Sequence, residues 1–91
     1  MKIKLRGGVS LAEQISFCRQ LAVILRSGLP LLNALQLLQK HGSAKQMLLC
    51  YRLQQRLRRG SSLAQALAAE ADYGKQLTVA LVAVGEESGE L

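Results

Sequence analysis

Residue types that carry catalysis or bind metals are scarce in this 91-residue chain, which has one histidine, two cysteines and no tryptophan. Tetrahedral zinc needs about four suitably spaced ligands, so this inventory excludes a zinc site. His41 stands beside Gly42 without an identifiable nucleophile or orienting acid, and neither glycine pattern typical of phosphate-binding loops occurs. We therefore expect a protein that is not an enzyme and that has no cofactor, metal or catalytic residue.

Long apolar runs are also absent. The longest, residues 77–84, is interrupted by Thr78 and is far shorter than the roughly 20 residues that a membrane-spanning helix needs. The basic N-terminal residues are followed by Gly7 and Gly8 instead of an apolar stretch, so they do not form a signal peptide. Cys18 and Cys50 fall on apolar stretches, which predicts buried free thiols in a reducing, cytosolic compartment.

Acidic residues are missing from most of the chain. Residues 1–61 hold eleven of the twelve basic residues and one acidic residue, Glu13, whereas residues 62–91 hold Lys75 and five acidic residues. A chain with this asymmetry can meet nucleic acid, an anionic membrane surface or an acidic protein, or can present a solvated basic surface. Net charge alone does not choose among these.

Helix-starting signals are frequent. Ser10–Glu13, Ser43–Gln46 and Ser62–Gln65 each have the spacing of a capping box, in which two side chains satisfy backbone N–H groups at a helix start. We expect helices from near Leu11 to Gly28, after Pro30 to His41, after Ser43 to Gly60, after Ser62 to about Ala69, and from about Lys75. The sequence predicts an all-α fold, an antiparallel helical bundle of four to five helices.

The apolar residues recur at three- and four-residue spacing and predict the core. In the first three helices they are Leu11, Ile15, Phe17, Cys18, Leu21, Ala22, Ile24 and Leu25, then Leu31, Leu32, Leu35 and Leu38, then Met47, Cys50, Tyr51, Leu53 and Leu57. The fifth helix is apolar on nearly every side and no further element follows it. A second copy is expected to cover it, which predicts a homodimer.

A basic stripe is the best candidate for a binding surface. Lys45, Arg52, Arg56 and Arg59 fall at spacings of seven, four and three on the third helix, with Arg58 nearby. We expect Arg52, Arg56 and Arg59 to bind a partner, either an acidic protein or an anionic leaflet. A solvated face is the alternative, and nucleic acid is disfavoured because no aromatic residues are interleaved for base stacking.

Three segments together resemble the type II secretion system F protein family, the inner-membrane platform proteins of type II secretion and type IV pilus assembly. The segments are RQLAVILRSGLPL at 19–31, LQQRLRRG at 53–60 followed by SSLAQAL at 61–67, and VAVGEESGEL at 82–91. The resemblance implies a six-helix cytoplasmic domain, generally present twice in a polypeptide that also has membrane spans. Residues 1–9 are then a basic extension, and residues 10–91 are a domain of this type that lacks its last helix.

The resemblance implies a non-enzymatic scaffold at the cytoplasmic face of the bacterial inner membrane. Its partners would be the secretion or pilus assembly ATPase and other inner-membrane assembly components, with the membrane reached only through spans outside these residues. No nucleic acid is implied. The alternative from a different class is a small basic helical protein that binds nucleic acid, which a steep salt dependence of affinity would indicate.

Overall fold

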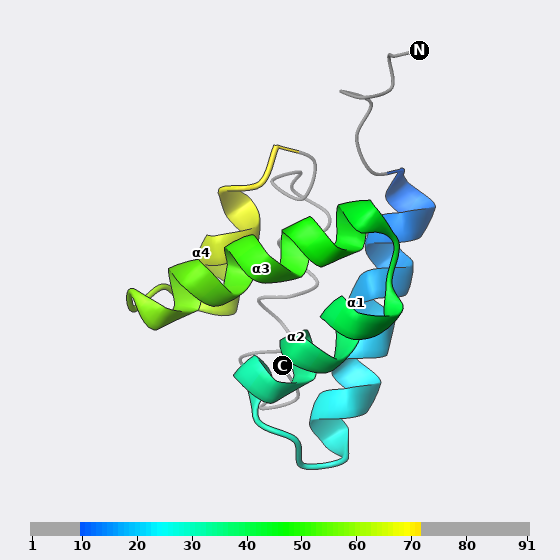
Figure 1. Ribbon diagram of the computed structural model, residues 1–91, viewed down its shortest axis with the longest axis horizontal. Coiled ribbons are helices and arrows are strands. Elements are labelled where there is room, and N and C mark those ends of the chain that lie inside the picture. The colour runs from blue at the N-terminus through cyan, green and yellow to red at the C-terminus, as the bar shows by residue number, and fades with distance from the viewer. Residues whose placement is uncertain (1–9, 72–91) are drawn as a thin grey trace.

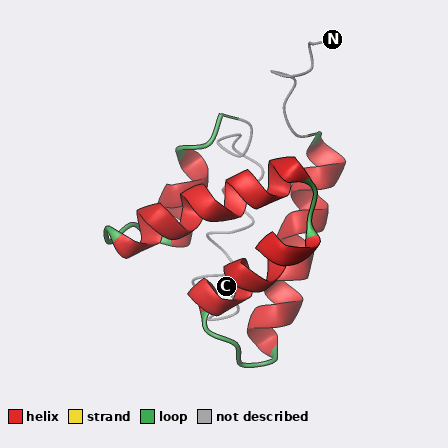
Figure 2. Ribbon diagram, viewed as in Figure 1, coloured by secondary structure: helices red, strands yellow, loops and turns green. Residues whose placement is uncertain are grey.

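A computed structural model describes residues 10–71, and within that range it contains four helices and no strand. They are α1 (Leu11–Arg26), α2 (Leu31–His41), α3 (Ala44–Arg58) and α4 (Leu63–Ala68). Each helix packs against the next along the chain, with the most extensive contact between α2 and α3 (Figure 1). Only loops and turns connect the helices (Figure 2), which confirms the predicted all-α fold. The expected fifth helix and the N-terminal extension at residues 1–9 lie outside the described residues. The predicted lack of a last helix concerns the end of the chain, which also lies outside them.

Capping side chains set where the helices begin. The Ser10 hydroxyl accepts from the Glu13 N–H at 3.1 Å, and the Glu13 carboxylate accepts from the Ser10 N–H at 2.9 Å. Ser62 and Gln65 form the same reciprocal pair at the start of α4. Two of the three predicted capping boxes are therefore confirmed.

The capping box predicted at Ser43 is only half formed. The Ser43 hydroxyl accepts from the Gln46 N–H at 3.2 Å, but the Gln46 side chain does not return to Ser43. Its amide Nε2 instead donates to the carbonyl oxygen of Leu38 at 3.1 Å. The two-residue link between α2 and α3 brings this carbonyl in the last turn of α2 within reach of Gln46.

The core draws on all four helices. Among residues 10–71 it comprises Phe17, Cys18 and Leu21 from α1, Ala34, Leu35 and Leu38 from α2, Leu49, Cys50 and Leu53 from α3, and Leu63, Ala66 and Leu67 from α4. This confirms the expected burial of Phe17, Cys18, Leu21, Leu35, Leu38, Cys50 and Leu53. None of the four helices combines the length and hydropathy needed to cross a bilayer.

The predicted core was wrong at several positions. Leu11 at the start of α1 is exposed, and in α3 the side chains of Met47 and Tyr51 are 46% and 54% exposed. Residues 47–51 are apolar in succession, so their spacing does not decide which of them face inward. The contacts of α3 with α2 and α4 decide it, because they turn Leu49 and Cys50 into the core and leave Met47 and Tyr51 outside.

Candidate functional site

The candidate site lies where α4 folds back against α3. The last turn of α3 ends in a Schellman motif, in which the Ser61 N–H donates to the Arg56 carbonyl oxygen at 3.1 Å and the Gly60 N–H donates to the Leu57 carbonyl oxygen at 3.0 Å. Gly60 has a φ of 103°, in the left-handed region that favours glycine. This turn reverses the chain, and α4 then carries Glu70 back to the middle of α3.

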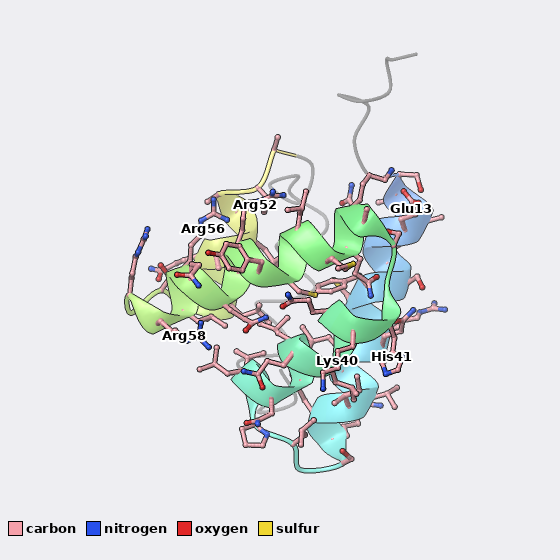
Figure 3. The ribbon with its side chains drawn as sticks, viewed as in Figure 1. Glu13, Lys40, His41, Arg52, Arg56 and Arg58 are labelled. Carbon is pink, nitrogen blue, oxygen red and sulfur yellow. The ribbon has the colours of Figure 1, made fainter. Side chains whose placement is uncertain are left out.

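Two arginines of α3 hold the Glu70 carboxylate, and we refer to Arg52, Arg56 and Glu70 as the arginine clamp. The two arginines are four residues apart and therefore lie one above the other on the same face of the helix. Arg52 donates from Nε to Oε1 and Oε2 of Glu70 at 3.2 and 2.9 Å, and from Nη2 to Oε1 at 2.8 Å. Arg56 forms a second ion pair with Glu70 through Nη1, which also donates to the Ala66 carbonyl oxygen at 3.4 Å. Figure 3 shows Arg52 and Arg56 on the side of α3 that faces α4.

These ion pairs differ from ordinary surface pairs because their shared carboxylate is buried. The Glu70 side chain is 9% exposed, against 45% for Arg52 and 29% for Arg56. Burial by itself would raise the pKa of Glu70, but hydrogen bonds from Arg52 and Arg56 outweigh it and hold the pKa below its usual value. The same hydrogen bonds raise the pKa of Arg52. Glu70 is therefore a buried, ionised carboxylate shared by two cations.

The predicted partner-binding residues separate into two groups. Arg52 and Arg56 meet at Glu70, whereas Arg59 occupies the C-cap of α3 and is exposed. Within residues 10–71, no carboxylate pairs with Arg58 or Arg59. Lys45, at the other end of the stripe, lies 3.8 Å from Glu13, and both side chains are more than half exposed, so this pair contributes little.

Glu70 was not predicted as part of the site. It follows Arg52 by 18 residues and Arg56 by 14, so helical spacing alone does not connect it to either. One signal could have found it, because Glu70 is the first acidic residue after Glu13. Glu70 is therefore the first carboxylate that the segment after α3 brings to this basic helix.

The arrangement positions helices relative to one another. In the part of the chain that the structure describes, no group of three or more histidine, cysteine, aspartate or glutamate residues is placed to hold a metal ion. Cys18 and Cys50 are buried free thiols, and burial raises the pKa of Cys50 to about 11. A thiol with so high a pKa is a poor nucleophile at neutral pH.

Comparison with known proteins identifies the family. The pattern of the family described as "Type II secretion system (T2SS), protein F" matches residues 17–91, which include the arginine clamp. The chain belongs to the type II secretion system protein F family. This confirms the resemblance drawn from the three sequence segments.

A curated relative extends this assignment. The chain is 42% identical over 80 residues to the "Type 4 fimbrial assembly protein PilC" of Pseudomonas putida. The aligned region covers 87% of this chain and 20% of the relative, so the chain spans about a fifth of that protein's length. The chain thus aligns with one portion of that longer relative.

Proposed function

We propose that this chain is a non-enzymatic scaffold domain of a platform protein in type II secretion or type IV pilus assembly, at the cytoplasmic face of the bacterial inner membrane. The observation that carries the proposal is the family match over residues 17–91, together with the identity to a fimbrial assembly protein. The arginine clamp supports it, because the clamp fixes helices relative to one another, as a scaffold requires.

The finer proposal is that the domain links the assembly ATPase to the membrane machinery through the basic side of α3. The clamp sets two guanidinium groups against one carboxylate, so it keeps a net positive charge after Glu70 is bound. Arg59 adds an exposed cation at the end of the same helix. An acidic surface on the partner would complement these charges, and guanidinium groups suit planar pairing with carboxylates.

The test must separate docking from folding. Reversing Arg52 or Arg56 would disturb the clamp, so the informative variant is Arg59→Glu, with Arg19→Glu on the exposed side of α1 as the matched control. In the full-length protein we expect Arg59→Glu to weaken co-purification with the assembly ATPase and to reduce pilus assembly or secretion, while Arg19→Glu leaves both unchanged. Equal behaviour of the two variants would contradict docking through this end of α3.

We also propose that the chain forms a homodimer. The proposal comes from the apolar pattern of residues 77–84, which lie outside the described residues. Sedimentation equilibrium at high micromolar concentration is the test, and a dimer is expected. A clean monomer would contradict it without affecting the scaffold role.

A further inference from the structure

The outward side of α3 combines exposed apolar and basic side chains. We call Lys45, Leu48, Tyr51, Gln55 and Arg58 the α3 outer face, because spacings of three and four residues place them on one side of the helix. Leu48 and Tyr51 are 56% and 54% exposed, and Lys45 and Arg58 are exposed before and after them. Within the described residues, two large apolar side chains therefore stand in solvent between two cations.

The charge of α3 is of one sign. The helix has four basic residues and no acidic residue. Within residues 10–71, two carboxylates lie near this charge: Glu70 pairs with Arg52 and Arg56, and Glu13 lies 3.8 Å from Lys45, with both side chains of that pair more than half exposed. Within residues 10–71, no carboxylate pairs with Arg58, so this end of the outer face presents uncompensated positive charge beside the apolar side chains.

The composition of this surface favours a lipid occupant. Tyrosine, leucine and long basic side chains together are the composition that places a helix in the headgroup region of an anionic bilayer.

From this combination, we infer that the α3 outer face rests on an anionic phospholipid leaflet. Leu48 and Tyr51 enter the headgroup layer, and Lys45 and Arg58 pair with lipid phosphates beside them. The inference relies on the proposed function only for the presence of a leaflet next to the domain. It adds a contact that the domain makes with its own residues, in addition to any membrane spans elsewhere in the protein.

Vesicle flotation of the 91-residue chain tests the contact without any other assembly component. We expect binding to vesicles of phosphatidylglycerol and phosphatidylcholine in equal parts, and none to vesicles of phosphatidylcholine alone. The bound fraction should fall as salt is raised, because salt screens exposed charges. Loss of ATPase association in the Arg59→Glu experiment would leave this result unchanged, so the two proposals fail separately.

Two paired variants separate the apolar and the basic contributions. Leu48→Ser with Tyr51→Ser should lower the partition coefficient at least tenfold, with Val23→Ser on the exposed side of α1 as the control for a lost apolar side chain. Lys45→Gln with Arg58→Gln should lower it about 25-fold, since each basic residue at an anionic surface contributes about fivefold.

The control for charge removes the same number of cations elsewhere. Arg19→Gln with Lys40→Gln gives the same net charge as Lys45→Gln with Arg58→Gln, and it should bind vesicles within about threefold of the unchanged chain. Circular dichroism verifies that each variant is folded, which is expected because all the replaced side chains are exposed.

Three results would overturn the inference. The first is no binding to anionic vesicles, and the second is an equal loss for the two pairs of cation variants, which would show a nonspecific charge effect. The third is retention on immobilised polyglutamate that depends on Leu48 and Tyr51 without vesicle binding, which would assign the face to an acidic protein instead.

Discussion

Replacing Glu70 with glutamine tests whether the arginine clamp stabilises the fold. Glutamine keeps the shape of the side chain but removes its charge, and its amide NH₂ group meets guanidinium N–H groups that need an acceptor. Breaking a fully buried ion pair costs about 3–5 kcal/mol. Arg52 and Arg56 are 45% and 29% exposed and recover part of this in water, so we expect a loss of about 2 kcal/mol in the free energy of unfolding.

Thermal and urea unfolding followed by circular dichroism measure this loss. For a domain of this size, about 2 kcal/mol corresponds to a fall in Tm of about 8–16 °C. Lys45→Gln, which removes the exposed pair with Glu13, is the matched control and should cost at most about 0.5 kcal/mol. A double-mutant cycle of Arg52→Ala with Glu70→Gln should give a coupling energy of about 1–2 kcal/mol. A loss under about 0.5 kcal/mol with no coupling would refute the clamp as a stabilising contact.

Three further predictions follow from the same structure. The pKa of Glu70 is lowered in the folded chain, so its contribution to stability is complete above the unfolded-state pKa of about 4.3 and is lost as pH falls through the folded pKa. In urea titrations, the stability difference between the unchanged chain and Glu70→Gln should therefore shrink below about pH 4.3. Gly60→Ala should cost about 1–2 kcal/mol from backbone strain alone, since an added Cβ meets nothing within 4 Å, and Gly60→Asn should cost less in the same assay. Ellman's reagent at pH 8 should leave Cys18 and Cys50 unmodified in the folded chain and react with both in guanidinium chloride, whereas rapid modification of the folded chain would contradict their burial.

Local chemistry made the helix starts and ends predictable. A serine followed three residues later by glutamate or glutamine identified the first residues of α1 and α4, and Gly60 identified the end of α3. These signals act within one turn and do not depend on the rest of the fold. The capping box at Ser43 is only half formed because the Gln46 side chain bonds instead to the Leu38 carbonyl oxygen of the preceding helix, a contact between helices that the local signal does not contain.

Features that depend on contacts between helices were harder to predict. The rotation of α3 could not be obtained from five consecutive apolar residues, so Tyr51 was assigned to the core although it lies in solvent. The basic stripe was visible in the sequence, but its division was not: Glu70 holds Arg52 and Arg56, whereas no carboxylate of residues 10–71 pairs with Arg59. Glu70 follows Arg52 by 18 residues and Arg56 by 14, so their pairing depends on where α4 places Glu70. Spacing along one helix cannot reveal such a contact.

The clamp also determines how mechanical force enters the domain. Helix α4 has six residues, and so short a helix has little resistance of its own to a pull on its C-terminal end. Glu70 lies just beyond α4 and is tied by its side chain to α3, so tension arriving from the chain after Ala71 reaches the longer helix first. Because α3 in turn packs extensively on α2, the load spreads into the core and bypasses α4.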